Sequence, residues 1–176
     1  YNAGAYAEAD IGNRYLVAIG NDAGYRFGPA IHSTAVGANA GNYATGSYNT
    51  FVGSQAGKGA TTSAPYSSGQ YNTVMGSEAL YAFTTATDNV AAGYRSLYKS
   101  TTGNYNTALG YASLYDLTVG EKNTAVGYHA GYFATGSNNA FFGYKAGYGA
   151  SAATTSGQYN TALGFEALKV FTTGGN

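Results

Sequence analysis

The chain has no cysteine and no tryptophan, and only 9% of its 176 residues are charged. Without cysteine, the sequence offers neither a disulfide framework nor thiolate ligands for a metal. Eight lysines and arginines balance eight aspartates and glutamates, so no net charge favours nucleic acid or an anionic membrane as a partner. The longest apolar runs are a few residues, too short for a helix that spans a membrane.

Glycine and tyrosine, by contrast, are abundant. The chain contains 27 Gly and 19 Tyr, and 44% of its residues are hydrophobic. Glycine-rich chains are often disordered, but a hydrophobic content this high, with 15% aromatic residues, supplies the surface that a folded chain buries. The composition therefore predicts a packed structure.

Nearly the same nine residues recur along the chain. Residues 106–114 read NTALGYASL, residues 123–131 read NTAVGYHAG and residues 160–168 read NTALGFEAL. We call the glycine at the fifth position the ruler glycine; it returns every 16 to 23 residues. A near-constant period of this length predicts a solenoid, in which each unit buries its apolar face against its neighbours. The ruler glycines are Gly4, Gly20, Gly37, Gly53, Gly76, Gly93, Gly110, Gly127, Gly143 and Gly164.

About 17 residues are too few for a helix pair but fit one turn of a β-coil. Thr-Ala-Val favours a strand, and the ruler glycine supplies a corner with an uncommon backbone conformation. A second strand is expected in segments such as 111–115, and a second corner at T-G-x-x-N stretches such as 102–106. Asparagine stands four residues before the ruler glycine in seven units, which favours a stacked amide ladder over a ligand site. The predicted fold is an all-β solenoid, or β-roll, of about ten coils.

The repeat has a second level. Residues 33–85 resemble residues 123–173 at an offset of about 90 residues, and the insertions at 58–68 and 148–156 coincide. We therefore predict a single domain over residues 1–176, formed by a five-coil duplication with halves of approximately 1–88 and 89–176.

Side-chain alternation along the strand predicts an interface. If the threonine and the residue before the ruler glycine point into the coil, the residue between them points outward. That residue is apolar in nine units, and an apolar stripe of this length is better explained by burial against another chain than by contact with water. The predicted interface consists of Ala18, Ala35, Phe51, Val74, Ala91, Ala108, Ala125, Phe141 and Ala162.

The two ends of the sequence predict an axial contact between copies. Joined head to tail, TTGGN and YNAG would place ruler glycines 16 residues apart, an ordinary coil. A solenoid end without a cap exposes backbone groups that invite another strand. The predicted axial junction consists of Tyr1, Asn2, Ala3, Val170, Phe171 and Asn176.

The units resemble two repeat families. Asn106–Leu114 and the T-G-x-x-N stretch before it resemble the repeats of long bacterial and phage tail-fibre-type proteins. Residues 15–23, YLVAIGNDA, are similar to the S-V-A-I-G-x-x-[AS] unit in the head domains of trimeric autotransporter adhesins. The resemblance implies a β-roll, left-handed and trimeric in the adhesins, with an adhesive or shaft-like role.

Groups that carry chemistry are sparse. Glu78 and Glu166 lie five coils apart, roughly 24 Å at ~4.8 Å per coil, too far to act on one bond. His32 and His129 have no metal-ligand spacing, and His129 falls at a position that we expect to be solvated. Tyrosines at fixed places in successive coils predict aromatic stacking, with a sugar-binding platform as the alternative. We expect no enzymatic activity, no cofactor and no metal.

The sequence thus favours a structural extracellular fibre protein that stacks head to tail into a filament. The alternative is a shaft or receptor-binding segment of a trimeric phage tail fibre or bacterial surface adhesin, with a surface glycan as partner. The expected partners are copies of the chain, in end-to-end and lateral contact, at the cell or virion surface. An ice-binding solenoid and a polysaccharide-cleaving spike are weaker alternatives, because the threonine column is expected to be narrow and inward and no carboxylates cluster.

Overall fold

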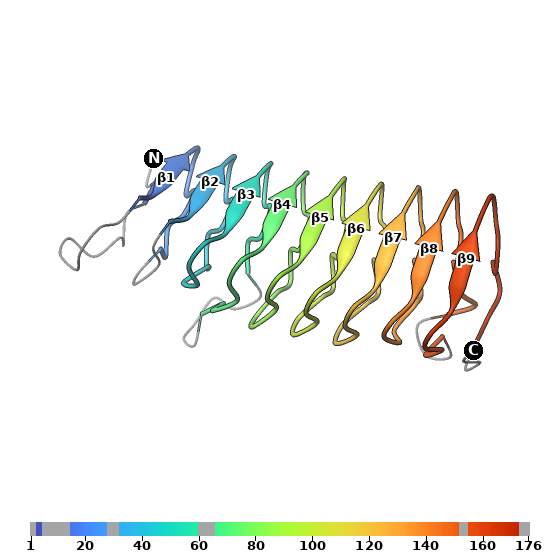
Figure 1. The fold of residues 1–176 in the computed structure, drawn as a ribbon. Coiled ribbons are helices and arrows are strands. Elements are labelled where there is room, and N and C mark those ends of the chain that lie inside the picture. The colour runs from blue at the N-terminus through green and yellow to red at the C-terminus, as the bar shows by residue number, and fades with distance from the viewer. Residues whose placement is uncertain (1–2, 5–14, 28–31, 60–65, 152–154, 173–176) are drawn as a thin grey trace.

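The computed structural model is an all-β solenoid whose strands form one parallel sheet in chain order (Figure 1). It describes residues 3–4, 15–27, 32–59, 66–151 and 155–172. No helix within these ranges is long and apolar enough to cross a membrane. The strands are β1 (Val17–Ile19), β2 (Thr34–Val36), β3 (Thr50–Val52), β4 (Thr73–Met75), β5 (Val90–Ala92), β6 (Thr107–Leu109), β7 (Thr124–Val126), β8 (Ala140–Phe142) and β9 (Thr161–Leu163).

The predicted solenoid is confirmed, but the described residues hold nine strands instead of ten. The ruler glycines from Gly20 to Gly164 have φ between 124° and 137°, whereas Gly4 has φ 62°. The Gly4 amide donates to the Ala23 carbonyl, as the Gly24 amide does to that of Ala40. Gly4 therefore corresponds to Gly24, which lies four residues after the ruler glycine Gly20. It is not a ruler glycine, so the expected tenth unit is wrong by four residues.

The ruler glycines are needed because successive coils approach closely at this corner. A Cβ on Gly110 would lie 2.4 Å from the carbonyl oxygen of Gly127 in the next coil. Gly110 also has φ 137°, which other residues rarely adopt. The predicted glycine corner is confirmed.

The expected second strand is wrong. Residues 111–116 form turns, and φ is positive at Ala112 (49°) and Leu114 (50°). Left-handed residues at every second position prevent an extended strand. Hydrogen bonds between coils nevertheless continue, since the Leu114 amide donates to the Ala130 carbonyl at 2.9 Å.

The middle residue of each strand points into the solenoid, so the predicted outward stripe is wrong. Ala35, Phe51, Val74, Ala91, Ala108, Ala125 and Phe141 are completely buried within one chain, Ala162 is nearly so, and Ala18 packs at the edge of the core. The alternation was correct but its direction was reversed. The threonine and the residue before the ruler glycine lie on the outside.

A buried asparagine ladder fixes that direction. The Oδ1 of Asn106 accepts hydrogen bonds from the backbone amide (2.9 Å) and Nδ2 (3.1 Å) of Asn123 in the next coil. The Nδ2 of Asn106 donates to the carbonyl of Gly120 at the second corner, 2.9 Å away. Because the asparagine points inward, the residue two positions later, in the middle of the strand, points inward as well. The predicted ladder is confirmed over Asn49, Asn72, Asn89, Asn106, Asn123, Asn139 and Asn160.

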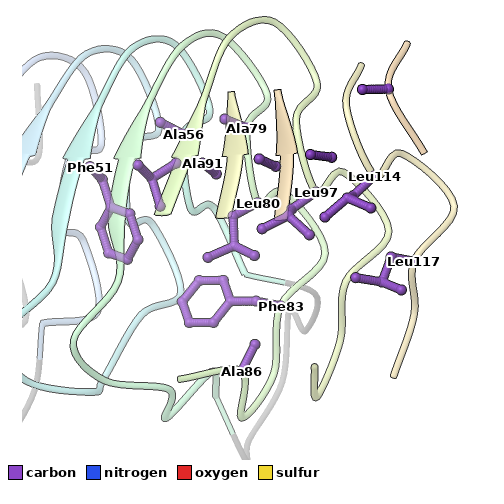
Figure 2. Packing of buried hydrophobic residues seen from close by; sticks show 14 of the residues in the cluster. Phe51, Ala56, Ala79, Leu80, Phe83, Ala86, Ala91, Leu97, Leu114 and Leu117 are labelled. Atoms are coloured by element: carbon purple, nitrogen blue, oxygen red, sulfur yellow. The ribbon is translucent and has the colours of Figure 1, made fainter. Parts of the chain in front are cut away.

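The core is filled in two ways (Figure 2). In some coils with a small strand residue the turn contributes a buried leucine, as Leu97 does in the coil of Ala91. Where the strand contributes Phe51, the turn has Gly57, and a Cβ there would lie 2.0 Å from the phenyl ring. Phe51 and Phe83 have ring centroids 5.7 Å apart.

The proposed duplication has a matching core pair. Phe141 and Phe171 lie 5.6 Å apart, in the second half, as Phe51 and Phe83 do in the first. The inner parts of the two insertions, residues 60–65 and 152–154, are outside the described residues.

Candidate functional site

The outward face of the nine-stranded sheet carries no charged residue. We call it the outer sheet face, formed by the first and third residues of every strand. The first positions hold Val17, Thr34, Thr50, Thr73, Val90, Thr107, Thr124, Ala140 and Thr161, and the third hold Ile19, Val36, Val52, Met75, Ala92, Leu109, Val126, Phe142 and Leu163. The strands are in register, so these residues form two continuous columns along the solenoid.

Exposed large hydrophobic side chains gather on and beside this face. Sixteen of the nineteen among the described residues lie in the strands or at the positions two residues before or after them. Tyr15, Val17, His32 and Thr34 line one shallow hollow, which places the position before the strand next to the outer sheet face. The three elsewhere are Val119, Leu168 and Val170. Exposed apolar surface concentrated in this way is typical of surfaces through which proteins associate.

Stacked aromatic ladders run along two sets of turn positions. The corner ladder follows the ruler glycines, and its ring centroids are 5.1–5.4 Å apart. The long ladder lies four residues further along, with centroids 4.9–5.4 Å apart. The corner ladder is Tyr94, Tyr111, Tyr128, Tyr144 and Phe165; the long ladder is Tyr81, Tyr98, Tyr115, Tyr132 and Tyr148.

This geometry favours stacking over the sugar-binding alternative. Tyr98 and Tyr115 are nearly parallel, with 3° between their planes. A sugar ring stacks on the face of an aromatic ring, and here neighbouring tyrosines already cover each other's faces. Burial raises the pKa of Tyr98 and of Tyr132, so both phenols stay protonated at neutral pH.

The sequence predicts that the side chains between the two ladders are solvated. In the structure, some of them pack against the rings of the ladders. Arg95 lies over the rings of Tyr94 and Tyr98, at 4.9 and 5.2 Å from their centroids. His129 stacks on Tyr128 at 4.0 Å. Burial, and then the charge of Lys145, lower the pKa of His129, and its Nδ1 is buried without a partner. His129 is therefore partly buried against the tyrosines, whereas the sequence predicts a solvated side chain.

The acidic residues considered for catalysis form ion pairs with nearby cations. Glu78 lies 2.7 Å from Nε of Arg95, and Glu166 lies 2.9 Å from Nζ of Lys169. In the described part of the chain, no three His, Asp or Glu side chains gather in a way that could hold a metal ion.

Of the predicted axial junction, the structure describes Ala3, Val170 and Phe171. Tyr1, Asn2 and Asn176 lie outside the described residues. Val170 is largely exposed, but Phe171 is buried against Phe141 of its own chain, so it does not present a free apolar layer. The predicted junction also requires Gly4 to be a ruler glycine. Because Gly4 corresponds to Gly24 instead, the head-to-tail join would not continue the repeat in phase.

Comparison with protein-family models, curated proteins and solved structures finds no match. The resemblance to tail-fibre and adhesin repeats therefore stays a prediction, supported by the residues that carry it.

Proposed function

We propose that the chain is a structural, non-enzymatic fibre protein of the cell or virion surface, and that its copies self-associate into a filament. The observation that carries this proposal is the uncharged outer sheet face. Nine strands ~4.8 Å apart, with about seven residues of ~3.3 Å each across the face and its borders, give roughly 900 Å². Specific interfaces bury about 800 Å² on each partner, so the face has the size that lateral association of two copies requires.

End-to-end stacking would use the hydrogen bonds that already join successive coils. The Thr124 amide donates to the Asn139 carbonyl of the next coil at 2.8 Å. Another copy whose first coil repeats this geometry would extend the ladder. Such a contact is heterologous and does not close, so it gives an open filament.

The outward threonines also bear on the ice-binding alternative. The threonine column is interrupted by Val90 and Ala140, and the adjoining column contains side chains as different as Met75 and Ala92. Because these two columns form an irregular surface, they fit a protein partner better than an ordered lattice of water.

A pair of glutamate substitutions tests the role of the outer sheet face. Met75→Glu places a charge at the third position of β4, where the native side chain is 53% exposed. If copies pack on this face, the unpaired charge is desolvated and association weakens by tenfold or more. Val119→Glu is the matched control, since Val119 is 60% exposed but lies outside the face.

Light scattering after size-exclusion chromatography compares the two variants over a concentration series. Loss of assembly in Met75→Glu alone supports the proposal. Equal assembly of both variants and the native chain would overturn it. A discrete native trimer would favour the alternative, a segment of a trimeric tail fibre or adhesin.

A further inference from the structure

The corner ladder brings exposed phenols together within one chain. The ring centroids of Tyr111 and Tyr128 are 5.1 Å apart with 16° between the planes, and those of Tyr128 and Tyr144 are 5.4 Å apart with 8°. These three side chains are 40–45% exposed. They are separated by a whole coil in sequence but held side by side in the folded protein.

We propose that Tyr111, Tyr128 and Tyr144 form a modification site, at which oxidation joins neighbouring rungs by carbon–carbon bonds. The reactants are two phenols and a peroxide, with a haem peroxidase of the one-electron type as catalyst. Each phenol loses one electron and one proton. The two phenoxyl radicals couple between carbons ortho to the hydroxyls, and the displaced ring hydrogens return to the oxygens. One hydrogen peroxide accepts the two electrons and two protons and becomes two waters.

The ladder favours coupling between its own rungs over coupling between molecules. Holding two reactants side by side converts a bimolecular step into an effectively unimolecular one. A phenoxyl radical on Tyr128 has a phenol on each side at about ring-contact distance. At the far end the ladder continues to Phe165, which has no hydroxyl and does not couple in this way.

Tyr105 provides an internal comparison. It is 57% exposed, more than any of the three rungs, yet it stacks on no other described ring. If exposure alone determined coupling, Tyr105 would react at least as readily. If stacking determines it, links within one chain form at the ladder and not at Tyr105.

Each link would fasten one coil to the next. Tyr111 and Tyr128 are 17 residues apart, so a bond between them closes a loop of about one coil. Closing a loop of this size in the unfolded chain raises Tm by roughly 6–12 °C for a protein of this length. The modification would therefore raise the thermal stability of the solenoid without changing its fold.

The test treats dilute full-length chain with horseradish-type haem peroxidase and hydrogen peroxide. Dityrosine fluorescence, denaturing gel electrophoresis and mass spectrometry of proteolytic fragments then locate the links. We expect chains of monomeric size that carry Tyr111–Tyr128 and Tyr128–Tyr144 links, together with a raised Tm.

Tyr128→Phe is the decisive variant because it keeps the ring in the stack and removes the phenol. It should lose both links and most of the corner-ladder fluorescence, whereas Tyr105→Phe should leave them unchanged. An unchanged link pattern in Tyr128→Phe would overturn the proposal, as would links in the native chain that form only between molecules. The ladder lies within one chain but borders the outer sheet face, so the reaction is run at a concentration at which light scattering shows monomers.

Discussion

At the residue scale, asparagine is the side chain that aligns one coil with the next. Asn106 accepts hydrogen bonds from the backbone amide and Nδ2 of Asn123 and donates one to the carbonyl of Gly120 at the opposite corner. Asn49, Asn72, Asn123 and Asn139 likewise accept from both the amide and Nδ2 of the next asparagine. The atoms in the Asn106 bonds are buried, so water cannot replace a missing partner. The ladder therefore links the strand to the second corner in every coil that contains it.

Asn106→Ala should lower the free energy of unfolding by about 2–5 kcal/mol, because it leaves a buried amide of Asn123 and the carbonyl of Gly120 without partners. Asn21→Ala is the control, since Asn21 is exposed and its side chain bonds, within the described residues, only to the adjacent Asp22. Urea denaturation followed by circular dichroism measures both. Similar losses in the two variants would show that the ladder adds nothing specific.

The sequence contained enough information to orient this ladder. Asparagine four residues before the ruler glycine and alanine two residues before it share one face of the strand, because strand side chains alternate. An amide ladder is useful only when it is buried, and combining these two facts would have placed Ala108 inside. Alternation alone does not decide which face of the strand is buried, and the expected outward stripe rests on alternation alone.

At the element scale, the turn after the ruler glycine departs most from what residue preferences predict. Leu97 and Leu114 adopt φ of 51° and 50°, which is uncommon for leucine. Their side chains are fully buried, and packing within the solenoid offsets the backbone cost. Leucine has no local preference for this conformation. The sequence alone therefore does not predict a turn where a second strand was expected.

The exchange between phenylalanine and leucine gives a test of the core. Phe51→Ala should destabilise the fold by about 3–5 kcal/mol, because it empties the space over Gly57. Gly57→Leu alone should also destabilise it, since the phenyl ring already occupies that space. The double variant reproduces the Ala91 and Leu97 arrangement of another coil and should recover much of the loss.

A double-mutant cycle in urea measures this coupling. The two substitutions share one cavity, so their effects should be strongly non-additive, by more than about 1 kcal/mol. Additive losses would mean that Phe51 and the leucine position do not compete for the same volume.

At the scale of the whole molecule, the repeat correctly predicts the solenoid but misplaces its first unit. Nine in-register strands follow directly from the spacing of the ruler glycines. Gly4 was misplaced because a glycine four residues after the ruler position also recurs, at Gly24, Gly41 and Gly57. Glycine identity does not distinguish φ near 130° from φ near 55°, and only the hydrogen bond to Ala23 does so.

The outer sheet face is the feature that connects the fold with the proposed function. The interior is filled by the chain's own residues, so the lateral contacts that we propose between copies would fall on the threonine and apolar columns outside. These columns continue along the entire sheet, and copies stacked end to end would extend them. Lateral and axial association are thus compatible within one filament.

The most direct test is electron microscopy of the purified native chain over a range of concentrations. Self-association predicts filaments that lengthen with concentration and whose power spectrum shows an axial layer spacing of ~4.8 Å, the distance between parallel strands. Isolated monomeric particles at every concentration, up to roughly millimolar, would contradict the proposed fibre function.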